Sequence, residues 1–171
     1  MKVVLGIFYF LLIMLAAGLL AALVAPSSVL VSRSVAVEGS SAVVFRQIAH
    51  FEQWEKWDPW HAADYEQIRS YSGGPRDRTQ SVSWKNRNGE LCTIQRSEMV
   101  DNKYFSCIIR RGQRVGIGTF TLNQTGRSTK VTTTYTSELG YPQRFVNYFM
   151  NKWAGEKMEQ MLQDLKKQTE R

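Results

Sequence analysis

The sequence predicts an α+β protein: one apolar helix, then an antiparallel sheet, then a long C-terminal helix. Three patterns support this prediction. Residues 3–25 contain no charged side chain. Between residues 65 and 138, runs rich in β-branched and aromatic residues alternate with turn sequences such as Asn-Gly and Thr-Gly, which is typical of consecutive hairpins and therefore of an antiparallel meander. Beyond Pro142 these turn sequences stop and apolar residues recur at helical spacing.

The apolar run from Val3 to Ala25 is long enough to cross a membrane. At about 1.5 Å per helical residue it reaches across a hydrocarbon core of roughly 30 Å. A secretory signal peptide has a shorter apolar region of about 7–15 residues, and the nearest cleavage-like sequence here, Leu23-Val24-Ala25, begins with a leucine. We therefore interpret residues 1–26 as an uncleaved signal anchor and residues 27–171 as the folded domain, with a cleaved signal peptide as the alternative.

The charges around this run predict an orientation. Lys2 precedes the run, and the next charged residue is Arg33. Under the positive-inside rule the short N-terminal side stays in the cytoplasm, and long domains are translocated largely regardless of their charge. We expect a single-pass protein of the inner (plasma) membrane whose C-terminal domain lies in the periplasm or outside the cell.

The folded part opens with a strand, a helix and a tryptophan cluster. Valines at alternate positions of 29–37 predict a strand with one buried face. A helix is expected over 41–50, after the break at Gly39. Three of the five tryptophans follow at positions 54, 57 and 60, and Pro59 ends the helical turn. Such a cluster indicates either a structural corner or the wall of a pocket.

The following strands are expected in hairpin order, over 65–71, 79–84, 91–99, 104–110, 115–122 and 129–137. Cys92 and Cys107 fall on two adjacent strands. With a turn near Asp101, residue 92 would pair with about residue 110, which leaves Cys107 roughly 10 Å out of register. A disulfide needs Cα atoms within about 7 Å, so we predict two buried free thiols.

The C-terminal helix, expected over 142–169, carries two apolar stripes. The first consists of Phe145, Phe149 and Trp153, and the second of Ala154, Met158, Met161, Leu162 and Leu165. At 100° per residue the second stripe lies roughly 140° around the helix from the first. A straight helix cannot bury both stripes on one flat sheet. The pattern therefore predicts a kink or break near Gly155, with the first half covering a cavity mouth or docking elsewhere, for example at the membrane interface.

The net charge of +7 favours anionic partners without indicating a fold. Basic residues are spread over the strands and their turns and do not form the aromatic-interleaved pattern of an RNA-binding sheet. We therefore expect no nucleic acid partner and, for the basic loops, contact with anionic lipid headgroups. The sequence contains no nucleotide-binding, zinc-protease or esterase motif, and we expect no cofactor and no metal.

Acid–base chemistry has few candidates. His50 lies at an expected helix end, where a cation is favourable. His61 follows the tryptophan cluster, with Asp58 and Asp64 three residues away on either side. These residues could bind zinc or form a base with its orienting partner, but spacing across a proline turn does not place them on one face.

The order of elements resembles the helix-grip fold of the START-like (SRPBCC) superfamily, which includes polyketide cyclase/dehydrase-like and Bet v 1-like proteins. The resemblance covers about residues 29–168 and is carried by 33–37 with 44–48, by the Trp54-x-x-Trp57-x-Pro59-Trp60 sequence, and by Gly140-Tyr141-Pro142 with the residues that follow. The last match is to a bacterial subgroup that also carries an N-terminal membrane span. The resemblance implies a six- to seven-stranded antiparallel sheet wrapped around the long C-terminal helix.

In that superfamily the cavity between sheet and helix holds an apolar ligand such as a lipid, sterol or polyketide. The resemblance thus implies a membrane-anchored domain that binds or transfers a hydrophobic ligand. The residues expected to line its cavity are Trp60, His61, Tyr71, Trp84, Tyr104, Phe145, Phe149, Met150 and Trp153. Each of them could equally be ordinary core.

Two alternatives remain open at this stage. The first is a cyclase/dehydrase-type enzyme in which His61, Asp64, Tyr71 or Tyr104 supplies acid–base chemistry. The second is a non-catalytic scaffold whose cavity has collapsed. Ligand binding and catalysis both predict a cavity of a few hundred Å³ or more, whereas a filled core would favour the scaffold. The sequence does not indicate an oligomeric state.

Overall fold

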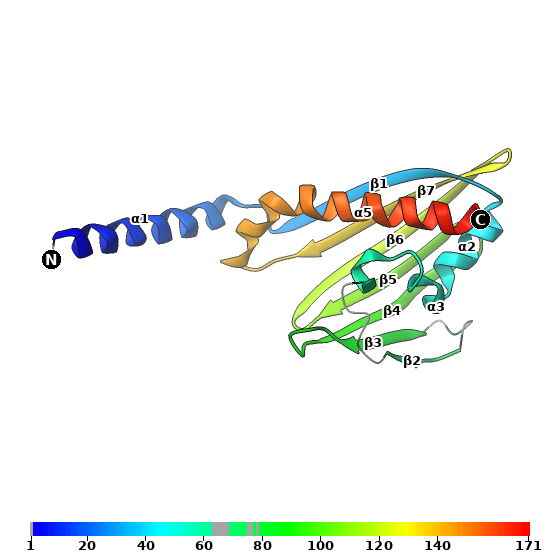
Figure 1. Ribbon diagram of the computed structural model, residues 1–171, viewed down its shortest axis with the longest axis horizontal. Coiled ribbons are helices and arrows are strands. Elements are labelled where there is room, and N and C mark those ends of the chain that lie inside the picture. Colours follow the sequence, from blue (N-terminus) through cyan, green and yellow to red (C-terminus); the bar gives the residue numbers. More distant parts are fainter. Residues whose placement is uncertain (1, 63–68, 75–76, 78) are drawn as a thin grey trace.

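The chain forms one sheet with a long helix against it and a second long helix projecting from one end (Figure 1). A computed structural model describes residues 2–62, 69–74, 77 and 79–171. The helices are α1 (Lys2–Val24), α2 (Ser41–Ala49), α3 (Phe51–Trp54), α4 (Pro59–Ala62), the 3₁₀ turn η1 (Gln143–Val146) and α5 (Asn147–Thr169). The strands are β1 (Ser28–Glu38), β2 (Ser70–Ser72), β3 (Ser81–Lys85), β4 (Leu91–Val100), β5 (Tyr104–Arg111), β6 (Arg114–Thr125) and β7 (Ser128–Glu138).

The seven-stranded sheet is antiparallel throughout, in the order β1-β7-β6-β5-β4-β3-β2. The predicted meander is therefore confirmed, and β1 joins it by pairing with the last strand. Residues 65–68 of the strand expected over 65–71 lie outside the described residues. Turn residues in the left-handed region, such as Asn102 (φ 62°) and Gly126 (φ 61°), reverse the chain at the predicted hairpins.

The first strand and the cysteines follow the sequence pattern. Val29, Val31 and Val37 are buried and the residues beside them are exposed. Cys92 pairs with Arg111 rather than with residue 110, because the β4–β5 turn is centred on Asn102 instead of Asp101. That displacement alone would move the partner by two residues, and a bulge between Arg96 and Glu98 takes back one of them. Both thiols are buried and free, as predicted.

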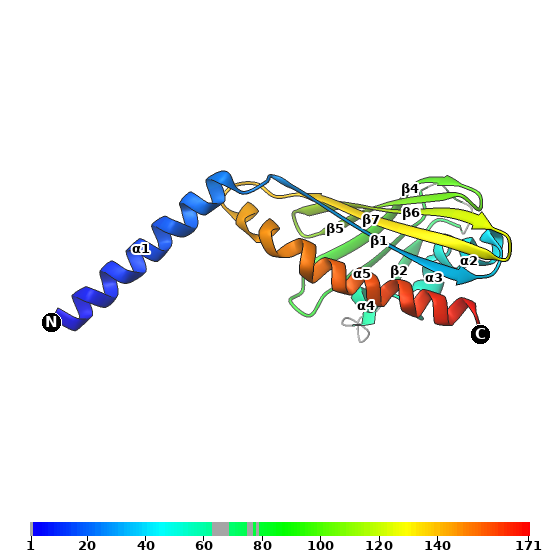
Figure 2. The ribbon, with the colours of Figure 1, turned by 90° about the horizontal axis from the view of Figure 1, so that it is seen from above.

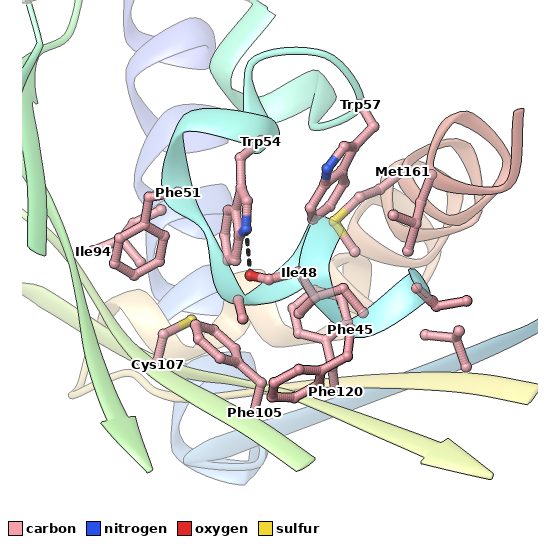
Figure 3. Close-up of a cluster of buried hydrophobic side chains, with 14 of the residues drawn as sticks. Phe45, Ile48, Phe51, Trp54, Trp57, Ile94, Phe105, Cys107, Phe120 and Met161 are labelled. Atoms are coloured by element: carbon pink, nitrogen blue, oxygen red, sulfur yellow. Dashed lines mark hydrogen bonds between the residues drawn. The ribbon is translucent and has the colours of Figure 1, made fainter. Parts of the chain in front are cut away.

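The tryptophan cluster is a corner of the core (Figure 3). Trp54 is 4% exposed, and its indole N–H donates to the carbonyl of Ile48, at 2.8 Å, across the turn between α2 and α3. The Trp54 ring lies 5.2 Å from those of Phe51 and Trp57 and about 6 Å from those of Phe105 and Phe120. Aromatic rings in these tilted and edge-on arrangements stabilise a fold by more than their buried area alone provides. The corner thereby joins the short helices to the middle of the sheet.

One arginine lies inside this core. Arg96 is 2% exposed, and its guanidinium donates to the carbonyls of Ala49 (2.5 Å) and Asp77 (2.7 Å) and to the side-chain oxygen of Gln80 (2.7 Å). Burial lowers the pKa of Arg96, with the charges of Asp77 and Glu52 opposing that shift. A forked donor that reaches several carbonyls suits this place better than the single ammonium of a lysine would. Arg96 thus holds the end of α2 against β4 instead of adding to the basic surface.

The predicted break near Gly155 is wrong. Helix α5 runs without interruption from Asn147 to Thr169. Its second stripe packs on the sheet, whereas the first stripe stays exposed. Because the sheet buries only one of the two stripes, the helix needs no bend. Gly155 has a different role: a Cβ there would collide with the guanidinium of Arg33, which crosses the helix and pairs with Glu159 at 2.7 Å.

We expect the two buried indoles to differ in how well phenylalanine replaces them. Trp54→Phe removes a buried hydrogen bond, whereas the Trp57 N–H has no hydrogen-bond partner among the described residues. Trp54→Phe should therefore lower the free energy of unfolding by about 1–3 kcal/mol more than Trp57→Phe does. Urea denaturation of the full chain in mild detergent measures both values, and an equal or larger cost for Trp57→Phe would contradict this account of the corner.

Candidate functional site

A cavity of about 190 Å³ lies between the inner face of the sheet and helix α5. Its floor consists mainly of buried apolar side chains from α3 and the central strands, namely Trp54, Trp84, Ile94, Cys107 and Phe120. Its roof comes from α5, with Met150, Trp153, Ala154, Met158 and Met161. Pockets for drug-sized ligands usually hold about 300–1,000 Å³. This cavity is smaller than that range and smaller than the few hundred Å³ expected from the sequence, so it can take only a small apolar molecule or one tail of a larger one.

The wall contributed by β7 is more polar, and glycines of β6 make room beside it. Thr133, Tyr135 and Ser137 alternate along β7 and line the cavity. A Cβ at Gly116 would overlap the Tyr135 ring, and one at Gly118 would lie 3.3 Å from the thiol sulfur of Cys107. Glycine inside a strand often marks such a close approach. The two glycines therefore keep this side of the cavity open.

The cavity opens at the end of the domain nearest α1. The exposed lining residues all lie at that end, where the β5–β6 hairpin, the end of β7, η1 and the start of α5 meet: Arg114, Val115, Glu138, Val146 and Trp153. Trp60 of α4 meets Trp153 edge to face, with ring centroids 5.1 Å apart. The guanidinium of Arg111 lies over the Trp60 ring, 5.8 Å from its centroid. Aromatic contacts and a cation–π contact therefore narrow the mouth.

The structure separates the predicted cavity residues into two groups. Trp60, Trp84, Met150 and Trp153 line the cavity. The residues away from its lining are Tyr71, Tyr104, Phe145 and Phe149. For His61 the structure describes only the backbone, in α4, and Asp64 lies outside the described residues.

Each residue of the second group has another location. The Tyr71 hydroxyl donates to Glu55 at 2.9 Å, and its pKa is raised by burial and by that carboxylate. Tyr104 begins β5 opposite Thr121, at the end of the sheet far from the mouth. Phe145 and Phe149 project outward, 46% and 68% exposed.

The cavity lining includes a buried carboxylate, Asp58, and a buried thiol, Cys107. Asp58 is 4% exposed, and its carboxylate accepts the backbone N–H of Trp60 at 3.0 Å. Burial raises the pKa of the Cys107 thiol to about 12, and the charge of Asp58 adds to that shift. A thiol with this pKa is a poor nucleophile at neutral pH. Within the described residues, no three His, Cys, Asp or Glu side chains come together to hold a metal ion.

Sequence reasoning missed the β7 wall and the two arginines at the mouth, and it considered Asp58 only as a partner of His61, not as a buried residue of the cavity lining. Alternating Gly116 and Gly118 in the middle of an expected strand was a usable signal, because both fall on the face that points toward the helix. The threonine-rich run of β7 predicted a strand but not which of its faces meets a cavity. Arg111 and Arg114 pair with each other across their hairpin, so the mouth position of one implied that of the other.

The sequence matches the family described as "Polyketide cyclase / dehydrase and lipid transport" over residues 28–170. The chain belongs to this family. The match begins where β1 begins, so it covers the sheet, the helices around it and the cavity of this START-like fold. None of the curated proteins has a sequence that matches the chain.

Solved structures share the fold at low sequence identity. A START superfamily protein from Mycobacterium smegmatis is 17% identical with a TM-score of 0.61, over 82% of this chain and 97% of that one. A Thermus thermophilus protein is 17% identical with a TM-score of 0.62, over 82% of this chain and 96% of that one. Norcoclaurine synthase from Thalictrum flavum, solved with dopamine and hydroxybenzaldehyde, is 10% identical with a TM-score of 0.62, over 82% of this chain and 86% of that one. Together they confirm the helix-grip fold predicted from the sequence.

Helix α1 stands outside the family match. Within it, Val3–Val24 is long and apolar enough to cross a membrane, and the segment lies near the N-terminus, where a signal sequence would also lie. Its side chains are almost all exposed. This apolar helix is therefore either a membrane span or a signal sequence.

We predict that both thiols resist modification in the native chain. Cys92 and Cys107 are fully buried, so a thiol reagent at neutral pH should react with them only after unfolding in urea.

The raised pKa of Cys107 also predicts that the stability of the fold depends on pH. The fold favours the protonated thiol, so its contribution to stability is complete below the ordinary pKa of 9.0 and is lost as the pH rises toward 12.

Denaturation of the wild type and of Cys107→Ala at increasing pH tests this dependence. The difference in unfolding free energy between the two should shrink above pH 9. A constant difference, or rapid labelling of the folded chain, would show that the thiol is not buried as described.

Proposed function

We propose that the protein is a membrane-anchored domain that binds or transfers an apolar small molecule, either a lipid or a polyketide-like compound. The observation that carries this proposal is the cavity itself, because its floor and roof are almost entirely apolar and its mouth is narrowed by two indoles. A few polar groups in a mainly apolar lining are typical of small-molecule sites. Membership of a family whose description includes lipid transport agrees with this proposal.

The anchor is part of the proposal. Residues 1–26 act as an uncleaved span, residues 27–171 form the binding domain, and the domain lies on the periplasmic or outer side of the inner membrane. Arg144 supports this arrangement, since its guanidinium donates to the carbonyls of Ala22 and Leu23 in the last turn of α1. The last carbonyls of a helix lack partners within it, and a cation there is also favourable to the helix dipole. A segment removed during export would leave Arg144 without these acceptors.

A chemical step of the cyclase or dehydrase type in the same cavity is the second candidate. One observation favours it: the buried carboxylate of Asp58 lines a cavity that also holds the hydroxyls of Thr133 and Tyr135. A carboxylate within hydrogen-bond reach of a reacting group can act as a general acid or base. Asp58→Asn separates the two functions, because binding alone should survive the loss of this charge and turnover should not.

The binding function predicts that a larger side chain in the cavity wall displaces the bound ligand. Ile109 of β5 lines the cavity, whereas Ile117 on the neighbouring β6 is 47% exposed and does not. Ile109→Trp should therefore fill part of the space and abolish binding, and Ile117→Trp, which adds the same indole, should leave binding unchanged. Native mass spectrometry of the full chain, purified from membranes in mild detergent, measures bound ligand directly.

In that experiment the wild type and Ile117→Trp should carry an added mass that Ile109→Trp lacks. Thermal unfolding of each variant shows whether it remains folded. A wild-type chain that carries no added mass, even after incubation with a total lipid extract, would exclude the binding function.

The orientation has its own test. Alkaline phosphatase folds to an active enzyme only where its disulfides form, outside the cytoplasm. A fusion after Arg171 should be active if the domain lies beyond the membrane. An expressed but inactive fusion would place the domain in the cytoplasm.

A further inference from the structure

An apolar patch surrounds the start of α5, on the outside of the domain. Its six side chains come from the loop before η1, from η1 itself and from the first turns of α5, and each is between 37% and 68% exposed: Tyr141, Phe145, Val146, Tyr148, Phe149 and Trp153. Contiguous apolar surface of this kind usually marks a site of interaction. This patch contains the first apolar stripe of the C-terminal helix, which the sheet does not cover.

The patch is joined to the end of α1. Arg144, between Tyr141 and Phe145, donates to carbonyls in the last turn of α1. Asn147 is 4% exposed, and its amide donates to the carbonyl of Pro26 at 2.6 Å. Figure 2 shows α1 leaving the domain on the side of the sheet that α5 covers. A bilayer crossed by α1 would therefore lie next to this face of α5.

The side chains of the patch suit that position. Tyrosine and tryptophan concentrate where a membrane meets water, because each combines a large apolar ring with a polar group. The charges nearby agree, since Arg111 and Arg114 have no carboxylate within ion-pair distance in the part of the chain that the structure describes. Basic side chains close to an anionic membrane surface are attracted to it.

The patch and the cavity also share residues. Val146 and Trp153 belong to the patch and line the mouth. We infer that the patch rests in the interfacial layer of the bilayer that holds α1, so that the cavity mouth opens onto the membrane and takes its ligand from it. The ligand class that fits is an amphiphile with one tail small enough for the cavity and an anionic head near Arg111 and Arg114. This inference rests on the proposed anchor and binding function.

A fluorescent label at Phe149 tests the contact with the membrane. Cys92 and Cys107 are fully buried, so a maleimide of the polarity-sensitive dye NBD should react only with an introduced cysteine. The full chain carrying Phe149→Cys is labelled and reconstituted into vesicles of phosphatidylethanolamine and phosphatidylglycerol. The matched control is Val100→Cys. The native Val100 is 47% exposed and lies at the opposite end of the sheet, beside the β4–β5 turn.

At position 149 we expect blue-shifted emission and at least about twofold stronger quenching by lipid nitroxides than at position 100, with weaker quenching by aqueous iodide. Emission and quenching equal to those at position 100 would overturn the inference. Blue-shifted emission without quenching by lipid nitroxides would also overturn it, because a second copy of the chain would then cover the patch.

The test can fail independently of the proposed function. Position 149 does not line the cavity, so a bound ligand does not report there. Loss of the chain from membranes in alkaline carbonate would refute the anchor, and absence of bound mass would refute ligand binding. A chain that stays in the membrane and binds ligand, yet shows a water-exposed label at 149, refutes only the inference.

Discussion

The hydrogen bond from the Trp54 indole to the Ile48 carbonyl fixes the corner on which the rest of the domain depends. It holds the helical turn of α3 against the end of α2, and the same ring then contacts both the core aromatics and the cavity. Without that bond a buried carbonyl would lose a partner in a place that water does not reach. One side chain thus closes the core on one face and forms the cavity floor on the other.

The cavity exists because α5 is used unevenly along its length. Its C-terminal part presents Leu162 and Leu165 to the sheet, and both side chains are buried and do not line the cavity. Its N-terminal half presents Ala154 and the ends of long, flexible side chains, opposite a strand in which glycines replace larger residues. Protein interiors otherwise leave few voids larger than a water molecule. Gly118 and Ala154 are small residues among the larger side chains of the lining, and they leave room for the cavity.

Periodicity predicted the sheet and the long helix, because burial repeats every second residue in a strand and every three to four in a helix. The expected hairpin register predicted the free thiols. It could not predict what covers each apolar stripe. Phe149 and Met158 belong to similar patterns, yet one is 68% exposed and the other is 3%. The kink expected at Gly155 failed for the same reason, since it assumed that the sheet buries both stripes. Trp60 and Trp153 lie far apart in the sequence, and only the fold reveals that they meet.

The connection between α1 and the sheet is very short. Helix α1 ends at Val24 and β1 begins at Ser28, and the intervening residues are held by Asn147. A flexible linker of n residues lets a domain explore about 5–6 Å × √n, but a hydrogen-bonded connection of this length allows almost no independent movement. With the proposed anchor in the membrane, a domain held so closely to its helix would not swing across the periplasm to deliver a ligand. Exchange with a distant acceptor would then require that the acceptor, or a soluble carrier, come to it.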